Sequence, residues 1–394
     1  MKPNNIPVIK FTPLGGLAQI GSNMSIFSTP DTTIAIDCGI LFPNDDHFNL
    51  NYLIPNFKKI NAIDHLILTH GHEDHIGGVV HFLDHYPKAI LWASPFCIEL
   101  LRKKFISTKH NPIINKFDNN SILKFNEIRV KPIQVNHSIP ETYGLHISDT
   151  NKNYCFLYIS DFKIDYTNEY EPPLNLQQIK TISSGYKIRY LMADSTNILT
   201  SQKASIPEKD VFLSLLDICK DAKKNIYIAT FSSNIFRIRS ILKIAKLLNK
   251  KVLLKGYSIE SFINSAIKCN YINQSESELI QNPNALSKND LGNFIVIVSG
   301  CQGEHKSSLN RLTKHHDPLL KPEKNDTLIM SSKAIPGNEK QVAQILNIYT
   351  ELGCEVITNQ THLVHTSGHP GKNDLKSLYH YFNPTHATPI HGES

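Results

Sequence analysis

Four side chains able to bind a divalent cation are crowded between positions 70 and 75 of this sequence. One residue separates His70 from His72, Asp74 and His75 come soon after, and a glycine pair stands at 77–78. In extended chain this spacing keeps His70 and His72 on one side, and a helix that starts after them supplies Asp74 and His75. Imidazole and carboxylate groups are the ligands of catalytic zinc, which keeps one position open for water. The pattern favours a catalytic metal site over histidines that merely lie on the surface or cap a helix.

Further residues able to bind a metal lie downstream, after expected strands. His137 follows the expected strand 130–135, and Asp161 follows the expected strand 156–159. Taken alone, each is more typical of an ordinary turn residue. Six histidines occur in the last 33 residues, whereas residues 147–304 contain none. This distribution indicates that the two ends of the chain build one site.

The elements that must position these residues fall into two patterns. The first alternates short apolar runs with turn residues, which predicts a packed β core. Strands are expected there at 33–37, 65–69, 89–92, 128–136, 154–160 and 190–194, and helices at 76–85 and 95–105. From about residue 205, strands and helices alternate as in a doubly wound parallel sheet. Helices are expected in this part at 211–222, 235–249, 258–266 and 338–352, strands at 226–230, 252–254, 294–298, 327–330 and 355–358, and a loop at 272–292.

The composition of the 394 residues, 41% hydrophobic and 19% charged, is that of an ordinary globular protein with two or more domains. A net charge of +6 is compatible with a polyanionic substrate, but many unrelated enzymes share it. Seven scattered cysteines without a paired motif indicate reduced thiols. No apolar run approaches the length of a membrane span, so a cytoplasmic location is expected.

The motif at 70–78 is the signature of the metallo-β-lactamase superfamily, which the sequence resembles without a gap. Later segments look like the ordered markers of its β-CASP branch, whose members act on nucleic acids. These segments are Asp194–Asn197, Thr230–Asn234, Pro336–Glu339, Ser367–His369 and Pro389–Glu393. Segments 14–16, 20–21, 37–39 and 300–304 are similar to the ribonuclease J family within that branch. The resemblance covers nearly the whole chain, from about residue 13 to residue 394.

This resemblance implies an α/β fold, namely a metallo-β-lactamase αββα sandwich with an inserted β-CASP domain built on a doubly wound parallel sheet. The expected division is a metallo-β-lactamase-type domain at 1–200, the β-CASP domain at 201–360, and a return segment at 361–394 that completes the active site. Chains of the family continue further and form homodimers or tetramers with the help of a C-terminal domain. This sequence ends three residues after His391, so the family's assembly is not carried over to it.

The resemblance also implies two Zn²⁺ ions per chain, although the same ligand types accept Mn²⁺. One ion would be held by His70, His72 and His137, the other by Asp74, His75 and His391, with Asp161 between them. A carboxylate in that position holds two ions about 3.5–4 Å apart, where both act on one hydroxide.

The resemblance assigns proton transfer to Asp194 and His369, as a general acid and base pair beside the metals. Without the family, Asp194 is equally typical of a turn at a strand end. The family usually has a serine two residues after the catalytic histidine, whereas Gly371 stands here within Pro370–Asp374. This departure predicts the loss of one hydrogen bond to the phosphate.

A phosphate site is expected where Ser233 and Asn234 precede the helix 235–249, because free N–H groups and the helix dipole attract anions there. The plain alternative is a helix cap without a ligand. Arg237 and Arg239 could add positive charge, although such arginines are more often solvated. The resemblance favours a pocket built from Ser233, Asn234, His365, Thr366, Ser367, Gly368 and His369.

The expected function is therefore metal-dependent hydrolysis of RNA phosphodiester bonds, in RNA processing and decay. The resemblance implies a single-stranded RNA substrate, 5′-to-3′ exonuclease or endonuclease action, and a preference for a 5′-monophosphate. One alternative is a lactamase-type hydrolase of small molecules, against which the inserted domain argues, since a small substrate needs no such lid. Another is a truncated, non-catalytic RNA-binding relative, against which the complete ligand set argues.

Overall fold

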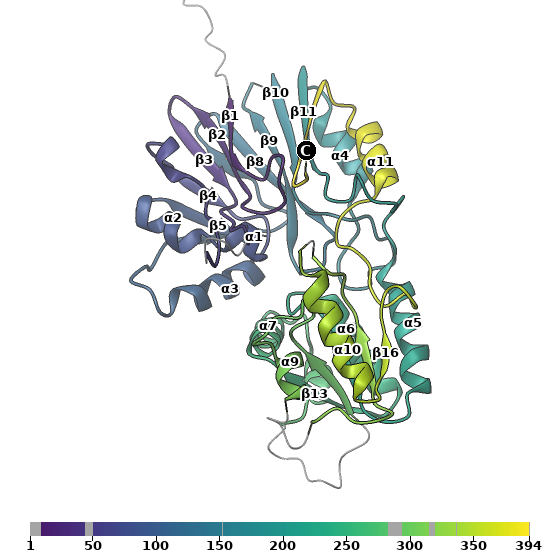
Figure 1. Ribbon diagram of the computed structural model, residues 1–394. Coiled ribbons are helices and arrows are strands. Elements are labelled where there is room, and N and C mark those ends of the chain that lie inside the picture. Colours follow the sequence, from purple (N-terminus) through teal and green to yellow (C-terminus); the bar gives the residue numbers. More distant parts are fainter. Residues whose placement is uncertain are drawn as a thin grey trace, which may run out of the picture. The chain divides into compact units, whose positions relative to one another are not determined.

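The computed structural model describes residues 9–43, 50–151, 153–282, 294–314, 320–335 and 337–393. The chain divides into two compact units, of which the first comprises Met1–Ser205 and Gly368–Ser394 and the second Ile206–Ser367 (Figure 1). The sequence predicted these junctions a few residues earlier, after residues 200 and 360. Among the described residues, no helix combines the length and apolarity needed to cross a membrane.

The first unit is built on two six-stranded sheets. One has the order β1 (Lys10–Gly15), β2 (Met24–Thr29), β3 (Thr32–Ile36), β4 (His65–Ile67), β5 (Ile90–Ala93) and β6 (Ile114–Lys116). The other has the order β17 (His386–Ile390), β11 (Ile188–Asp194), β10 (Tyr154–Ile159), β9 (Thr142–Asp149), β8 (Ile128–Val135) and β7 (Leu123–Phe125). Strands β3 to β6 are parallel, as are β10, β11 and β17, while the β7–β10 pairs are antiparallel.

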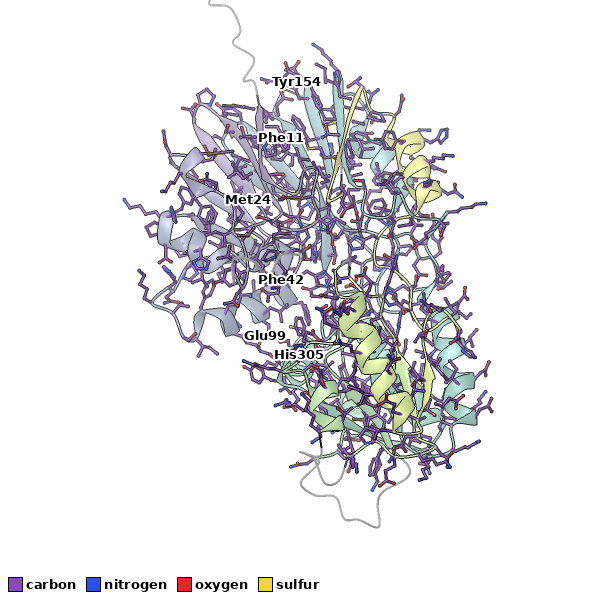
Figure 2. The ribbon with its side chains drawn as sticks, viewed as in Figure 1. Phe11, Met24, Phe42, Glu99, Tyr154 and His305 are labelled. Carbon is purple, nitrogen blue, oxygen red and sulfur yellow. The ribbon has the colours of Figure 1, made fainter. Side chains whose placement is uncertain are left out.

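Apolar side chains from both sheets form one core between them. Ile36 and Ile67 of the first sheet pack in the same buried cluster as Leu145 and Tyr158 of the second. Phe11 and Tyr154, which Figure 2 labels, pack against this cluster from strands of the two different sheets. The alternation of inward and outward side chains along each strand therefore gives the sandwich a shared interior.

Helices cover the outer faces of both sheets. In the first sheet, α2 (Val79–His85) connects the parallel strands β4 and β5, and α3 (Pro95–Phe105) connects β5 and β6. Such crossovers between parallel strands must pack on a face of the sheet. On the second sheet, Ile179 of α4 (Leu176–Ser183) and Leu378 of α11 (Lys372–Phe382) pack in a separate cluster with Leu157 and Leu191. The resulting order of layers is the predicted αββα sandwich.

The second unit contains a parallel five-stranded sheet. Its order is β13 (Lys251–Lys255), β14 (Phe294–Val298), β12 (Ile226–Ala229), β15 (Thr327–Met330) and β16 (Glu355–Ile357). Its helices are α5 (Glu208–Asp221), α6 (Ile235–Leu247), α7 (Tyr257–Lys268), α8 (Gln274–Ser277), α9 (Ser308–Thr313) and α10 (Glu339–Glu351). The chain builds β13 and β14 on one side of β12, then β15 and β16 on the other, which is the predicted doubly wound topology.

Two predicted elements differ from the structure. The helix expected at 76–85 is interrupted, because α1 (Glu73–Ile76) ends at Gly77 and α2 starts after Gly78. A Cβ on Gly77 would lie 2.7 Å from the side chain of Ile40, so close packing requires the glycine. The loop expected at 272–292 contains the short helix α8, which starts with an Asn273 capping box. Residues 283–292 of that prediction lie outside the described residues.

Candidate active site

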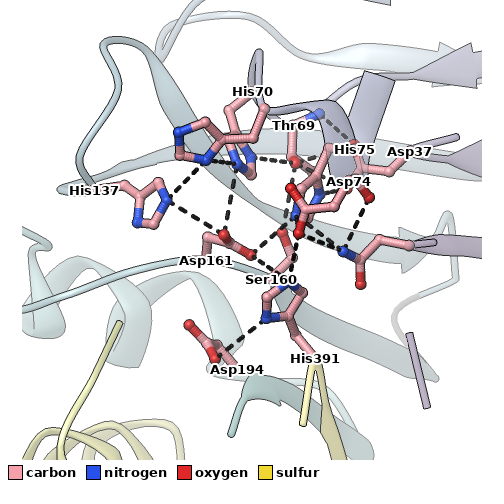
Figure 3. A network of polar contacts seen from close by, with 12 residues as sticks. Asp37, Thr69, His70, Asp74, His75, His137, Ser160, Asp161, Asp194 and His391 are labelled. Carbon is pink, nitrogen blue, oxygen red and sulfur yellow. Dashed lines mark hydrogen bonds and ion pairs between the residues drawn. The ribbon is translucent and has the colours of Figure 1, made fainter. Parts of the chain in front are cut away.

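The predicted metal ligands meet at one edge of the sandwich in the first unit (Figure 3). Strands β8, β10, β11 and β17 run in the same direction, so the residues after them share that edge. His137 follows β8, Asp161 follows β10, Asp194 ends β11 and His391 follows β17. His70 and His72 lie between β4 and α1, and Asp74 and His75 lie within α1.

Three histidines and one carboxylate oxygen form a first ligand group. The His72 Nδ1 atom lies 3.1 Å from Nε2 of both His70 and His137. Asp161 Oδ2 lies 3.6 Å from His70 Nε2 and 3.3 Å from His137 Nε2. Ligand atoms of a tetrahedral zinc, each about 2.0–2.1 Å from the ion, lie roughly 3.3 Å apart. The donor atoms of this group therefore fit a single zinc-sized ion.

A second group surrounds the other oxygen of the same carboxylate. Asp161 Oδ1 lies 3.2 Å from His75 Nε2 and 3.8 Å from His391 Nε2. Asp74 Oδ2 lies 2.9 Å from His391 Nε2 and 3.6 Å from His75 Nε2. Asp161 thus offers one oxygen to each group, which is the geometry of a carboxylate that bridges two ions. The predicted residues fit a two-metal centre in both number and chemistry.

Outer hydrogen bonds hold His70 and His75 in place. Asp37 Oδ2 lies 2.8 Å from His75 Nδ1, and Asp37 Oδ1 accepts from Thr69 Oγ1 at 3.0 Å. Thr69 Oγ1 also lies 3.0 Å from His70 Nδ1. A hydroxyl has a single hydrogen, so when Thr69 donates it to the carboxylate, the same oxygen accepts from His70 Nδ1–H. Both imidazoles then carry a proton on Nδ1 and direct Nε2 towards the metal position. Burial opposes a charge on His75, but Asp161, Asp74 and Asp37 outweigh it and hold its pKa well above the usual range, so a metal would displace its Nε2 proton.

A second carboxylate–threonine pair repeats this arrangement on the other side of the centre. Asp194 Oδ2 lies 2.7 Å from His369 Nδ1, and Asp194 Oδ1 accepts from Thr196 Oγ1 at 2.6 Å. Thr196 Oγ1 lies 2.7 Å from His391 Nδ1. Each carboxylate therefore holds one histidine directly and another through a threonine hydroxyl. The backbone carbonyl of Gly368, 2.8 Å from His137 Nδ1, orients a further ligand.

The buried charges of the centre favour a bound cation. Burial lowers the pKa of His72 to about 4 and holds the pKa of His70 and of His137 well below the usual range. These imidazoles are therefore neutral at pH 7, as metal ligands must be. Burial opposes ionisation of Asp161, but His391, His75 and His70 outweigh it and hold its pKa well below the usual range.

His369 and Asp194 form a hydrogen-bonded pair beside the ligands. The Asp194 side chain is fully buried, whereas that of His369 is 21% exposed. Burial disfavours the charged imidazole, but Asp194 and the nearby Asp161 and Asp74 outweigh it and raise the pKa of His369 to about 9. The ring stacks on His391, with 5.3 Å between the ring centroids. A protonated histidine next to the ligands is placed to act as a general acid.

The predicted phosphate-binding residues belong to both units. Gly368 and His369 lie in the first unit, and the rest of the set lies in the second. The Asn234 side chain caps α6 by accepting from Arg237 N at 3.0 Å, as the plain alternative expected. Thr366 Oγ1 donates to the carbonyl of Ile206 at 2.9 Å. The pocket itself stays a prediction.

The suggestion that two arginines of α6 add charge to this pocket, or are solvated, is wrong. The Arg237 side chain is fully buried and pairs with Glu208, with 3.0 Å between Nη2 and Oε2. Arg239 pairs with Glu276 at 3.0 Å, and both side chains are 15% exposed. Each positive charge is therefore neutralised by a carboxylate within the second unit.

Several positioning residues were not recognised from the sequence. Asp37 and Thr196 fall within segments that resemble the family, and Thr69 ends an expected strand, but no role was predicted for any of them. A threonine or aspartate next to a strand end is too common to signal such a role. Asp374 is a further example, since its Oδ2 accepts from the backbone N–H groups of Ser205 and Gly371, each at 2.8 Å. Asp374 thereby connects the C-terminal segment of the first unit, which starts at Gly368, to the end of its N-terminal segment at Ser205.

Three protein-family models match the chain. They are described as Beta-lactamase superfamily domain, over residues 32–173, Ribonuclease J, beta-CASP domain, over residues 223–349, and Zn-dependent metallo-hydrolase RNA specificity domain, over residues 355–394. The order of these matches agrees with the two-unit architecture and with the predicted class of function, a metal-dependent ribonuclease.

Several curated relatives are similar along almost the whole chain. Ribonuclease J 1 of Streptococcus pyogenes is 32% identical over 409 residues, which cover 100% of this chain and 70% of the relative. Ribonuclease J of Corynebacterium glutamicum is 30% identical over 384 residues, 96% of this chain and 53% of the relative. The chain thus spans about half to two thirds of the length of such relatives. A solved structure of an Enterococcus faecalis protein of unknown function has a TM-score of 0.66 at 16% identity, covers 98% of this chain and 94% of its own, and supports the fold alone.

Proposed function

The chain belongs to the ribonuclease J family, and we propose that it hydrolyses phosphodiester bonds of RNA at the centre around Asp161. The observation that carries this proposal is the position of the Asp161 carboxylate, whose two oxygens face two separate ligand groups. Two-metal sites of this kind are typical of enzymes that cleave phosphodiesters. The neutral imidazoles of His70, His72 and His137 beside the ionised carboxylate of Asp161 support catalysis over a purely RNA-binding role.

We further propose that the bound ions are two Zn²⁺ per chain, with Mn²⁺ as the alternative that these ligands also accept. His70, His72 and His137 would hold one ion, and Asp74, His75 and His391 the other, with Asp161 shared. When bound, the metals would supply the Lewis acidity that lowers the pKa of water and neutralises phosphoryl oxygens.

Residues of this chain would transfer a proton to the leaving group and orient the imidazole rings. Asp194 accepts a hydrogen bond from His369 Nδ1, which orients the ring and stabilises its protonated form. His369 would then give a proton to the leaving 3′-oxygen, which prevents an unstable alkoxide. Asp37 with Thr69, and Asp194 with Thr196, would keep the ligand imidazoles in the tautomer that the metals require.

The proposed substrate is single-stranded RNA, cleaved from the 5′ end or internally during RNA processing and decay in the cytoplasm. The match to an RNA specificity domain at residues 355–394 supports RNA over a small-molecule substrate. We propose that Ser233, Asn234, His365, Thr366, Ser367, Gly368 and His369 contact phosphate groups and favour a 5′-monophosphate.

One experiment separates the candidate functions. The metal-loaded full chain is incubated with a 5′-phosphorylated RNA oligomer, and separately with a β-lactam and a small thioester. Cleavage of RNA alone is expected, and it should be lost in His72→Ala, which removes a ligand lying 3.1 Å from two others. RNA cleavage at the wild-type rate by that variant would overturn the two-metal proposal, whereas hydrolysis of the small substrates alone would support the lactamase-type alternative.

A further inference from the structure

Arg237 is the bulkiest fully buried side chain among the described residues. A guanidinium group is stable in such surroundings only if its charge and its donors are matched. In this structure a single carboxylate matches the charge, because Arg237 Nε and Nη2 donate to the two oxygens of Glu208 at 3.0 and 3.1 Å. The pair is neutral as a whole, so Arg237 cannot serve as an electrostatic phosphate ligand.

The remaining nitrogen of the guanidinium binds elsewhere. Arg237 Nη1 donates to the backbone carbonyl of Val364 at 2.8 Å and to Ser331 Oγ at 2.5 Å. Ser331 Oγ in turn donates to the same Val364 carbonyl at 2.7 Å. Two buried donors therefore bind one backbone carbonyl at the end of the second unit. Carbonyls of connecting segments are more often hydrated at the surface.

These contacts join the beginning and the end of the second unit. Glu208 is in the first turn of α5, just after the unit starts at Ile206, and Val364 stands just before the unit ends at Ser367. The hydrogen bond from Thr366 Oγ1 to the Ile206 carbonyl ties the same two stretches together. Arg237 thus connects the beginning and the end of the second unit to each other.

Arg237 also holds the cap of α6. Its backbone N–H donates to Asn234 Oδ1 at 3.0 Å, while its guanidinium binds Val364. The two halves of the proposed phosphate pocket in this unit, the start of α6 and the segment 365–367, are therefore attached to one residue. A change in the guanidinium would move one half relative to the other.

We propose that Arg237 is a positioning residue, which fixes the segment 364–367 against the start of α6 and so sets the preference for a 5′-monophosphate. This inference rests on the proposed function, because the preference has meaning only for an RNA substrate. Arg237 acts through the backbone of its neighbours and touches no reacting atom.

The test replaces the ion pair as a whole. Arg237→Met combined with Glu208→Gln removes the hold on Val364 without leaving a carboxylate buried and unpaired. Arg239→Met combined with Glu276→Gln is the matched control, since it removes the other ion pair of α6, which does not involve Val364. Arg237→Lys is the milder variant, because a lysine keeps the charge but cannot pair with both Glu208 oxygens and still reach Val364.

Two readouts are compared across these full-length, metal-loaded proteins. Hydrogen exchange at the amides of residues 365–367 should become about tenfold faster in the Arg237 variants and stay unchanged in the control. The ratio of kcat/KM between a 5′-monophosphate and a 5′-hydroxyl RNA oligomer should fall about fivefold, through KM for the phosphorylated oligomer rather than through kcat. Metal content should stay at the wild-type value.

The outcomes distinguish this inference from the proposed function. Unchanged exchange at 365–367 in the double variant and in Arg237→Lys would overturn the positioning role. Equal loss with both oligomers would show a merely structural effect and would also overturn it. If the wild-type chain cleaves RNA without discriminating the two 5′ ends, the link to phosphate is wrong even when exchange accelerates. If it cleaves no RNA at all, the proposed function fails while the exchange result still decides whether Arg237 holds the segment.

Discussion

The two units of this chain bury polar side chains in opposite ways. In the second unit, the guanidinium of Arg237 meets a carboxylate, a hydroxyl and a carbonyl, so every partner is complementary. In the first unit, Nε2 of His70 and Nε2 of His137 each lie 3.1 Å from Nδ1 of His72. The lone pairs of these nitrogens repel one another unless a proton or a cation lies between them. The first kind of cluster is satisfied by protein groups alone, whereas the second gains its stability by binding metal. Buried polarity marks a functional site when its members do not satisfy one another.

The largest effect is expected from Asp161→Asn, which tests whether the polar cluster of the first unit depends on metal. The amide keeps the size of the side chain but removes the negative charge that both ligand groups share, each through its own oxygen. We expect the metal content to fall to one ion or none, and RNA cleavage to fall by about 10³-fold or more. Elemental analysis and initial cleavage rates measure the two effects. Wild-type values for both would show that Asp161 is no bridge.

Asp194→Asn should lower catalysis far more than metal content, although Asp194 also orients the ligand His391 through Thr196. The asparagine loses the charge that stabilises protonated His369, with which Asp194 shares a 2.7 Å hydrogen bond. We expect kcat to fall by about 10²–10⁴-fold while two ions stay bound. Single-turnover cleavage and metal analysis of the same preparation check this. A loss of metal as large as the loss of activity would mean that Asp194 acts only by orienting the ligand His391 and not in proton transfer.

Arg237→Met alone should show the structural character of the second cluster. The change removes a fully buried guanidinium and leaves the Glu208 carboxylate, which is 13% exposed, without its partner, so it should cost about 3 kcal/mol of unfolding free energy. Arg239→Met breaks a pair in which both side chains are 15% exposed, so it should cost less. Urea unfolding, followed by a signal from the second unit, measures the unfolding free energies of the two variants. Equal costs for the two variants would contradict the contrast in burial.

The two threonines sharpen the account of the metal centre. Thr69→Val and Thr196→Val each remove the hydroxyl that connects a carboxylate to a ligand imidazole. We expect metal affinity to fall by about 10–100-fold in each case. Thr69→Ser and Thr196→Ser keep the hydroxyl and should restore most of it. Competition with a chelator measures the affinities, and serine variants as weak as the valine variants would exclude a role for the hydroxyl.

His146 offers a smaller test of a buried histidine without a ligand role. It lies on β9, and burial together with Lys131 lowers its pKa to about 4. Protonation therefore favours the unfolded chain, so stability is lost as the pH falls from about 6.5 towards 4, by about 2 kcal/mol at pH 5. His146→Leu should remove this part of the acid sensitivity. Urea unfolding at pH 7 and pH 5 gives the comparison, and an unchanged pH dependence would contradict the assigned pKa.

The sequence predicted the ligands well because their signal is local and chemical. The spacing of His70, His72, Asp74 and His75 predicts a metal site by itself, whereas His137 and Asp161 were identified as further ligands through the family resemblance. Apolar periodicity predicted a packed β core and the parallel sheet, because burial imposes the period of each strand and helix, and the resemblance added the αββα sandwich. The structure brings these ligands together in the first unit.

The partners of the ligands could not be predicted in the same way. Asp37 pairs with His75, which lies 38 residues further along the chain, and the residues next to Asp37 do not predict that contact. Arg237 was expected either to add charge to the phosphate pocket or to be solvated, because only the tertiary structure places Glu208 and the Val364 carbonyl around it. The interruption at Gly77 depends on the approach of Ile40 from another segment. Long-range packing, rather than propensity, decides all of these features.

The most direct test of the two-metal centre is the number of ions that the folded chain binds. Purified, metal-free protein is titrated with Zn²⁺, and bound metal is counted by elemental analysis after removal of the excess. The convergence of six further ligands around Asp161 predicts two ions per chain, with protons released as they bind. A folded chain that takes up no ions, or a single one, would contradict the central claim.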